Sequence, residues 1–240
     1  AAARWSRAER ARQEEAARAA RGEALARMAA AVAHEVRNPL GIIRGAVELV
    51  RARSQDALPE RDRERLSDVL GEVERLRRLT QDFLDLSAEP ALEPAPVDLA
   101  EVARDAARGS AAVHPELEVR IALDGAPRVR GDPGRLRQVL ANLLANAAQA
   151  GAHTVRIDGG AEGGLVKVRV QDDGPGIPAE VRARLFDPFA TGREGGTGLG
   201  LAVSRRIVER HGGTLALAAA NGAESATGTT FELRLPGAGH

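Results

Sequence analysis

The sequence predicts two domains of different class, a helical hairpin that forms a dimeric four-helix bundle and an α/β sandwich that follows it. Residues 4–53 are rich in Ala, Arg and Glu with Pro39 as their one proline, which is typical of a long helix. Residues 89–96 are punctuated by prolines, so helix cannot continue there. Beyond them, strand and helix patterns mix. We therefore place a coiled coil and hairpin domain at 1–88, a linker at 89–96 and a second domain at 97–240.

Each helix of the predicted hairpin carries one apolar stripe. The first stripe consists of Leu25, Ala29, Val32, Val36, Leu40, Ile43, Val47 and Val50. A break at 54–59 precedes a second helix at about 60–87, whose stripe consists of Leu66, Val69, Val73, Leu76, Thr80 and Phe83. An extra residue enters the first stripe around Pro39, so a kink is expected there. Because a hairpin with one stripe per helix cannot close a core alone, we expect it to form a homodimer.

The second domain mixes the two periodicities. Helices are expected at 99–108, 133–150 and 199–211, and strands at 117–123, 128–130, 154–158, 165–171, 214–219 and 229–235. Several strands follow one another without an intervening helix. This order predicts a sandwich with sequential antiparallel strands, and it argues against a doubly wound parallel sheet.

Composition excludes several classes of function. The formal net charge is +0 and the pI is near 7.2, which argues against a dedicated nucleic-acid binder and against a polybasic membrane-surface protein. Cysteine is absent, so thiolate metal sites and cysteine nucleophiles are excluded. Lys167, the one lysine, lies in a strand-like run, so neither a P-loop nor a eukaryotic-type kinase lysine motif is present. No apolar run approaches the roughly 20 residues that span a bilayer.

A histidine motif stands on the first helix. If Val32 and Val36 lie in the seam, His34 falls at the outermost heptad position and faces water. Glu35 beside it is suited to take a proton while the other ring nitrogen attacks phosphorus, and Asn38 follows one turn later on the same face. The zinc-helix pattern His-Glu-x-x-His fails, because the fifth residue is the asparagine. An isolated surface histidine would otherwise be only a solvated side chain.

Two amides recur on the largely apolar helix predicted at 133–150. Asn142 and Asn146 are four residues apart, and they either cap neighbouring loops or supply oxygen to a Mg²⁺ beside phosphates. After the strand at 165–171, Asp172, Gly174 and Gly176 follow an Asp-x-Gly-x-Gly spacing, which is either an ordinary turn or a site where the backbone is closely approached.

A glycine loop leads into the last helix. Residues 196–200 read Gly-Thr-Gly-Leu-Gly, a spacing that differs from the dinucleotide-binding fingerprint, and no strand immediately precedes them. A loop of this kind at a helix start offers free N–H groups to a triphosphate.

The histidine motif resembles the H box of the bacterial sensor histidine kinases. Residues 34–40 read His-Glu-Val-Arg-Asn-Pro-Leu. The resemblance implies that His34 is the phosphoacceptor, that Glu35 accepts its proton, and that Asn38 acts in dephosphorylating the partner. It also implies a response-regulator receiver domain as partner, with an aspartate that takes the phosphoryl group.

The later motifs resemble the remaining boxes of the same family. Residues 142–147 resemble its N box, residues 172–177 and 196–201 its two glycine boxes, residues 186–189 its F box, and residues 190–195 its mobile ATP lid. The family likeness implies the Bergerat-type ATP-binding fold, with ATP and Mg²⁺ as cofactors, Asn146 on the metal, and Asp172 on the adenine amino group. The implied binding set is Asn142, Asn146, Asp172, Gly174, Gly176, Arg193, Gly196, Thr197, Gly198, Leu199 and Gly200.

Two other functions stay open at this point. One is an ATPase clamp of the same superfamily, in which ATP gates dimerisation, although such clamps place no His-Glu-x-x-Asn-Pro on an upstream hairpin. The other is a non-catalytic dimeric scaffold that has kept the fold. The chain begins without Met, so we expect a cytoplasmic fragment whose upstream sensor or membrane anchor is left off.

Overall fold

A computed structural model describes the residues 35–53, 58–87, 92–125, 127–191, 197–218 and 228–238. His34, Arg193 and Gly196 lie outside the described residues. The chain divides into two compact units, Ala1–Pro90 and Ala91–His240, and each unit is considered by itself. Among the helices in these described ranges, none combines the length and the apolar composition that a membrane span requires.

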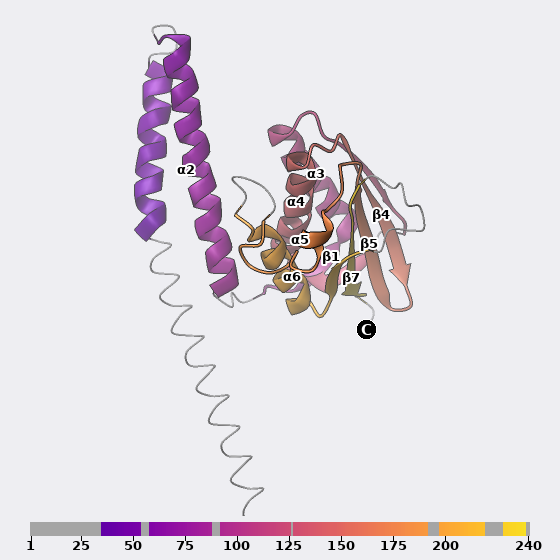
Figure 1. Ribbon diagram of the computed structural model, residues 1–240. Coiled ribbons are helices and arrows are strands. Elements are labelled where there is room, and N and C mark those ends of the chain that lie inside the picture. The colour runs from indigo at the N-terminus through magenta and orange to yellow at the C-terminus, as the bar shows by residue number, and fades with distance from the viewer. Residues whose placement is uncertain are drawn as a thin grey trace, which may run out of the picture. The chain divides into compact units, whose positions relative to one another are not determined.

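The first unit is a helical hairpin (Figure 1). Residues 35–53 form one continuous helix through Pro39, where the sequence predicts a kink. Helix α2 spans Glu60–Ser87, the bounds that the sequence predicts. The carbonyl of Pro59 accepts hydrogen bonds from the backbone N–H groups of Asp62 and Arg63, which closes the first turn of α2. Acidic side chains in that turn, Glu60 and Asp62, favour the helix start.

The interior of the single hairpin is thin. Leu40, Val73 and Thr80 are buried between its helices, and the Thr80 hydroxyl donates to the carbonyl of Leu76 at 2.8 Å. Leu25, Ala29 and Val32 of the predicted stripes lie outside the described residues, and six of their eleven described members are exposed in the single chain. The exposed members include Val36, Ile43, Val50, Val69, Leu76 and Phe83. The hairpin therefore leaves an apolar face that one copy alone does not cover.

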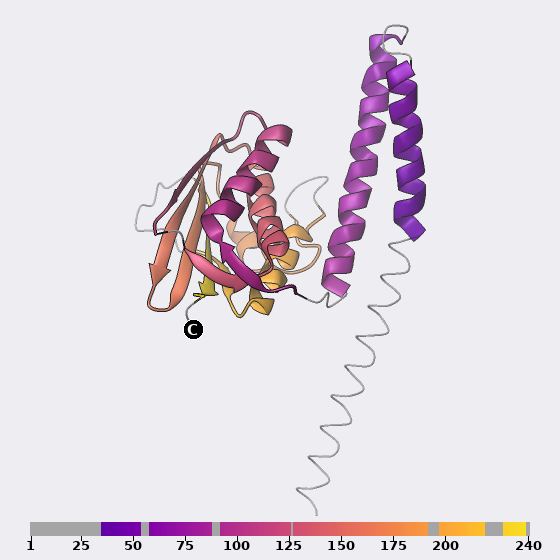
Figure 2. The same ribbon diagram turned by 180° about the vertical axis from the view of Figure 1, so that it is seen from behind.

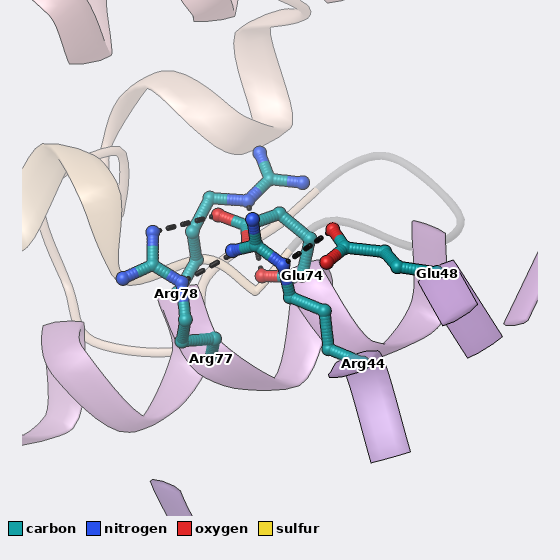
Figure 3. A network of polar contacts seen from close by, with 5 residues as sticks. All are labelled: Arg44, Glu48, Glu74, Arg77 and Arg78. Carbon is teal, nitrogen blue, oxygen red and sulfur yellow. Dashed lines mark hydrogen bonds and ion pairs between the residues drawn. The ribbon is translucent and has the colours of Figure 1, made fainter. Parts of the chain in front are cut away.

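Ion pairs occupy the polar surface of the hairpin (Figure 3). Arg77 donates two hydrogen bonds to the carboxylate of Glu74, at 2.9 and 2.8 Å, and Arg44 donates to Glu48 at 2.9 Å. The hydrogen bond from Arg77 holds the pKa of Glu74 below its ordinary value, although partial burial opposes this. Exposed pairs of this kind contribute about 0.3–0.5 kcal/mol each. They therefore show which surface of the hairpin faces solvent but add little to its stability.

The second unit is a mixed sheet covered on one face by helices (Figures 1 and 2). The sheet has the order β2-β4-β5-β7-β6. Its strands are β2 Glu118–Leu123, β4 Thr154–Glu162, β5 Leu165–Asp172, β6 Thr214–Leu217 and β7 Thr230–Pro236, and its covering helices are α3 Leu99–Val113, α4 Pro133–Gln149 and α6 Gly200–Arg210. The short helix α5 spans Ala179–Arg182, and β1 Ala95–Asp98 pairs with β3 Arg128–Gly131 in a separate two-stranded sheet.

The core lies between the sheet and these helices. Alternate strand residues point inward, as in β5, where Val166, Val168 and Val170 are buried. Leucines of α4, among them Leu136, Leu143 and Leu144, pack from the helix side and are almost fully buried. Each such side chain contributes about 1.5–3 kcal/mol, so this layer fixes α4 and α6 on the sheet.

The strand arrangement differs from the sequence prediction in its order and in the direction of one pair. Strand β3 pairs with β1 outside the main sheet, and β5 pairs with β7 instead of with the next strand, β6. Sequential antiparallel strands were expected throughout the sheet, yet β2 and β4 pair in parallel, with Val119 opposite Val155. The reason is the connection, since β3 and α4 lie between these strands and supply the crossover that parallel pairing requires.

Element boundaries differ as well. Strand β4 continues to Glu162, four residues beyond the predicted end at 158. Strand β1 begins at Ala95, inside the segment expected as a linker, and α3 continues to Val113, five residues beyond the predicted end at 108. The prediction of a hairpin followed by an α/β domain is confirmed.

Candidate functional site

Helix α4 is positioned by its first turn and by its apolar face. Asp132 caps it, since its Oδ1 accepts the backbone N–H of Arg135 at 3.0 Å, and Pro133 takes the first helical position. The apolar face is buried in the core. Asn142 and Asn146 lie one turn apart on this helix and are half-buried. They are the two amides that the sequence indicates as candidates for a metal and phosphate site.

Asn142 joins α4 to the start of α6. Its side-chain Nδ2 donates to the carbonyl of Gly200 at 3.2 Å and to the hydroxyl of Ser204 at 3.2 Å. A Cβ placed on Gly200 would stand 3.7 Å from the Asn142 amide, so the two elements are in van der Waals contact. The structure thus brings the predicted N box and second glycine box together, although they are almost 60 residues apart in the sequence.

Asp172 ends β5 as a buried carboxylate. It is 7% exposed, and its Oδ1 accepts backbone N–H groups from Gly174 at 2.9 Å and from Thr229 at 3.0 Å. Burial raises the pKa of Asp172, while these hydrogen bonds oppose the rise. The neighbouring Asp173 instead accepts the backbone N–H groups of His153 and Thr154 at the surface. Of the two adjacent aspartates, only Asp172 is therefore a buried acceptor.

The glycines after Asp172 keep the backbone close to it. A Cβ on Gly174 would lie 3.0 Å from Asp172 Oδ1 and 3.6 Å from the Cβ atoms of Ala150 and Ala152. Gly176 has φ +81°, a conformation that L side chains rarely adopt, and its Cβ would lie 3.3 Å from the carbonyl of Gly228. The backbone conformation at position 176 therefore favours glycine, and a side chain at position 174 would crowd Asp172 and the two alanines, so this segment of backbone is tight.

The second glycine loop is closed at its base by backbone contacts. Phe189 has φ +64° and donates its N–H to the carbonyl of Gly198 at 3.0 Å, while Gly198 itself has φ +66°. Thr197 Oγ1 accepts the N–H of Leu199 at 3.3 Å. The Leu199 side chain is fully buried, so at a ligand this residue has only its backbone to offer. Helix α6 then begins at Gly200, and its first-turn N–H groups and dipole favour an anion.

Phe186 has a packing role in the predicted F box. Its ring meets Phe231 of β7 edge to face at 6.4 Å, and the Arg205 guanidinium of α6 lies 5.4 Å from its centroid. The sequence interpretation that the phenylalanines also pack is consistent with this contact.

On the hairpin, the described part of the histidine motif is exposed. Glu35 and Asn38 both face solvent in the single chain. Arg37 reaches across the hairpin instead, and its Nη2 donates to Gln81 Oε1 on α2 at 3.2 Å. The predicted phosphoacceptor, His34, precedes the described residues.

Sequence reasoning missed two residues of the α/β site. The backbone of Thr229 holds Asp172, and the buried hydroxyl of Ser204 bonds to Gly200 and Asn142. Neither residue belongs to a motif. A backbone N–H and a lone hydroxyl give no periodic signal in the sequence, so only the fold identifies these two residues.

The donor chemistry of this site fits a nucleotide and Mg²⁺. A buried carboxylate at a strand end suits an exocyclic amino group, and a helix start suits phosphates. The described residues contain no group of three or more His, Cys, Asp or Glu that could hold a metal. Mg²⁺ keeps several waters and binds substrate phosphates, so one amide oxygen from Asn146 is compatible with it.

Comparisons with known proteins identify the family of each unit. Residues 131–239 match the family model described as histidine kinase-, DNA gyrase B-, and HSP90-like ATPase, and residues 24–91 match the His Kinase A (phospho-acceptor) domain. Among curated proteins, the sensor histidine kinase ZraS of Escherichia coli is 38% identical over 219 residues, covering 89% of this chain and 46% of ZraS. The chain thus spans about half the length of that relative.

Solved structures are similar in fold. Full-length ShkA in complex with AMPPNP has a TM-score of 0.70 at 30% identity, over 88% of this chain and 46% of ShkA. The histidine kinase ThkA in complex with the response regulator TrrA has a TM-score of 0.62 at 30% identity, over 93% of this chain and 65% of that one. The mycobacterial sensor histidine kinase MprB has a TM-score of 0.53 at 30% identity, over 60% of this chain and 98% of that one.

The chain therefore combines a phosphoacceptor domain of the His Kinase A type with an ATPase domain, the two domains of a histidine kinase core. The chain belongs to the sensor histidine kinases of two-component systems.

Proposed function

We propose that this chain is the autokinase core of its sensor histidine kinase: it uses ATP to phosphorylate His34 and passes the phosphoryl group to an aspartate of a receiver domain. The observation that carries the proposal is the contact between Asn142 and Gly200, which joins the two predicted phosphate-side motifs in one place. The histidine motif ahead of this domain supplies an acceptor that an ATPase clamp or a scaffold would not need.

Within the nucleotide site, each end has its own acceptors and donors. Asp172, buried at the end of β5, accepts the adenine amino group, and the tight backbone at Gly174 and Gly176 lets the base approach. Thr197 and Gly198, with Gly196, Leu199 and Gly200, offer backbone N–H groups to the phosphates at the start of α6. Arg193 contacts the γ-phosphate, and Asn142 belongs to the same site.

The metal is assigned to Asn146, whose side-chain oxygen would hold Mg²⁺ together with the phosphates. At this position Mg²⁺ would supply charge neutralisation for the phosphoryl group that is transferred.

The hairpin provides the acceptor chemistry. A lone pair of one His34 ring nitrogen forms a bond to the γ-phosphorus, the bond from phosphorus to the β–γ bridging oxygen breaks, and ADP leaves. Glu35 takes the proton from the other ring nitrogen, which keeps the phosphorylated ring neutral. Asn38, exposed one turn on, orients a water in a separate phosphatase reaction, in which the water attacks the aspartyl phosphate of the partner and inorganic phosphate leaves.

Two partners follow from the hairpin. Its exposed apolar stripe supports a homodimer in which two hairpins form one four-helix bundle. We keep the functional domains at residues 1–88 and 97–240, with β1 extending the second domain back into the linker to Ala95. The receiver partner is supported by the solved complex of ThkA, a similar kinase, with a response regulator. Because ATP and receiver domains are its substrates, we assign the chain to the cytoplasm, with nucleic acid and direct membrane contact outside its function.

The proposal is tested by incubating the chain with γ-labelled ATP and Mg²⁺. Wild type should acquire acid-labile phosphate, and His34→Ala should acquire none while still binding ATP. His153→Ala, which changes an exposed histidine of the α/β unit, serves as the matched control and should be labelled like wild type. Acid-labile phosphate on His34→Ala would sink the assignment of the acceptor, and hydrolysis of ATP without protein labelling would favour the clamp.

A further inference from the structure

Ser204 is a fully buried hydroxyl on α6 that the proposed chemistry does not use. It is 0% exposed and lies next to Val203, which is buried in the core. Its Oγ donates to the carbonyl of Gly200 at 2.8 Å and accepts from Asn142 Nδ2 at 3.2 Å. Since Asn142 also donates to the Gly200 carbonyl at 3.2 Å, the three residues form a closed triangle of hydrogen bonds.

The triangle joins two parts of the proposed site that the chain does not connect locally. Gly200 is the first residue of α6 and the last glycine of the phosphate-side loop. Asn142 stands one turn before Asn146 on α4, which is held by the core. A rigid link between these residues therefore sets the position of the α6 N–H groups relative to the amide assigned to the metal.

The geometry points to Ser204 and Asn142 as positioning residues. They hold the start of α6 at a fixed place relative to Asn146, so that the α6 N–H groups and the Asn146 amide bind the phosphates and the metal of one ligand. This inference rests on the proposed function and assigns Asn142 a role through α6, with its Nδ2 occupied by protein acceptors.

Removal of the Ser204 hydroxyl should weaken the binding only of ligands that carry phosphates. The adenine end is held separately, by the bonds of Asp172 to Gly174 and Thr229. Loss of the Ser204 hydroxyl should therefore weaken Mg-ATP and leave adenosine unaffected. General loosening of the domain would weaken both ligands alike.

The experiment compares Ser204→Ala with wild type by competition against a fluorescent ATP analogue, using Mg-ATP and adenosine as competitors. Removal of one hydrogen bond of this type predicts a loss of about five-fold in affinity for Mg-ATP, with adenosine within about two-fold of wild type. Ser204→Cys, which keeps a weak donor of similar size, should recover part of the loss. The double variant with Asn142→Ala should lose less than the sum of the single variants.

Ser110→Ala is the matched control. Ser110 Oγ on α3 is buried and has no hydrogen-bond partner among the described residues, so its removal breaks no bond and should leave both affinities unchanged. Equal losses for Mg-ATP and adenosine, or no loss in Ser204→Ala, would overturn the inference. Labelling of wild-type His34 is measured in parallel, because its absence would instead reject the proposed function together with the inference.

Discussion

The imidazole Nε2 of His211 accepts the backbone N–H of Asp132 at 2.9 Å. Its Nδ1 lies 2.7 Å from the carbonyl of Ile207, so the neutral ring carries its proton on Nδ1 and donates it there. This ring joins the end of α6 to the cap of α4, while Asn142 joins the middle of α4 to the start of α6. The two helices of the proposed nucleotide site are thus tied at both ends of α6.

His211→Ala should destabilise the α/β unit by about 1–3 kcal/mol, because it removes both hydrogen bonds and leaves a gap beside Gly131. Urea unfolding followed by circular dichroism measures this loss. His153→Ala, at an exposed position, should change the free energy of unfolding by less than about 0.5 kcal/mol. Equal effects of the two substitutions would show that the link between α4 and α6 contributes nothing.

Gly198→Ala should be strongly destabilising. The residue has φ +66°, and an added Cβ would lie 2.6 Å from the Phe189 carbonyl carbon, so the base of the glycine loop would have to open. Gly109→Ala is the matched substitution, since its Cβ would meet nothing within 4 Å on α3 and should stabilise by about 0.5–1 kcal/mol. Thermal unfolding of both variants should therefore show shifts of opposite sign.

The sequence predicted elements best where one periodicity ran unbroken. The α2 bounds followed from a regular stripe and a clear break before it, whereas β1 was read as linker because Pro96 suggested an interruption. Pro96 is tolerated there because the strand pairs on one side only, with β3. The parallel pairing of β2 with β4 was missed because periodicity indicates which face of a strand is buried, not which strand lies beside it.

The residues of the candidate site likewise fall into those that the sequence identified and those that it missed. Gly198 and Asp172 were singled out because each stands in a motif of fixed spacing that resembles a box of the kinase family, and such a spacing is visible in a short stretch of sequence. Ser204 and Thr229 were missed because each bonds to a residue about 60 positions away in the sequence. Neither a single hydroxyl nor a single backbone N–H forms a spaced motif that a sequence pattern could reveal.

Asn146→Ala should abolish the dependence of ATP affinity on Mg²⁺, because it removes the amide oxygen assigned to the metal. The measurement is ATP titration with and without Mg²⁺. Gln149→Ala removes an exposed amide from the end of the same helix and should retain the wild-type Mg²⁺ dependence. A retained Mg²⁺ effect in Asn146→Ala would place the metal on other groups.

Asp82 on α2 makes the stability of the hairpin depend on pH. Burial raises the pKa of its carboxyl to about 6, the nearby Asp85 adds to the rise, and Arg78 opposes it. Because the folded pKa exceeds the ordinary value of 3.8, the stability that this group contributes is complete below about pH 4 and is lost as the pH rises through about 6.

Asp82→Asn should therefore stabilise the hairpin at pH 7 and have no effect at pH 4. A pKa rise of this size corresponds to about 3 kcal/mol, and partial exposure of the side chain reduces the expected gain to about 1 kcal/mol. Unfolding at fixed protein concentration, followed by circular dichroism from pH 4 to pH 7, measures the difference. Asp68→Asn, at an exposed position of α2, should show no such trend, and a gain for Asp82→Asn that stays constant with pH would contradict the assignment.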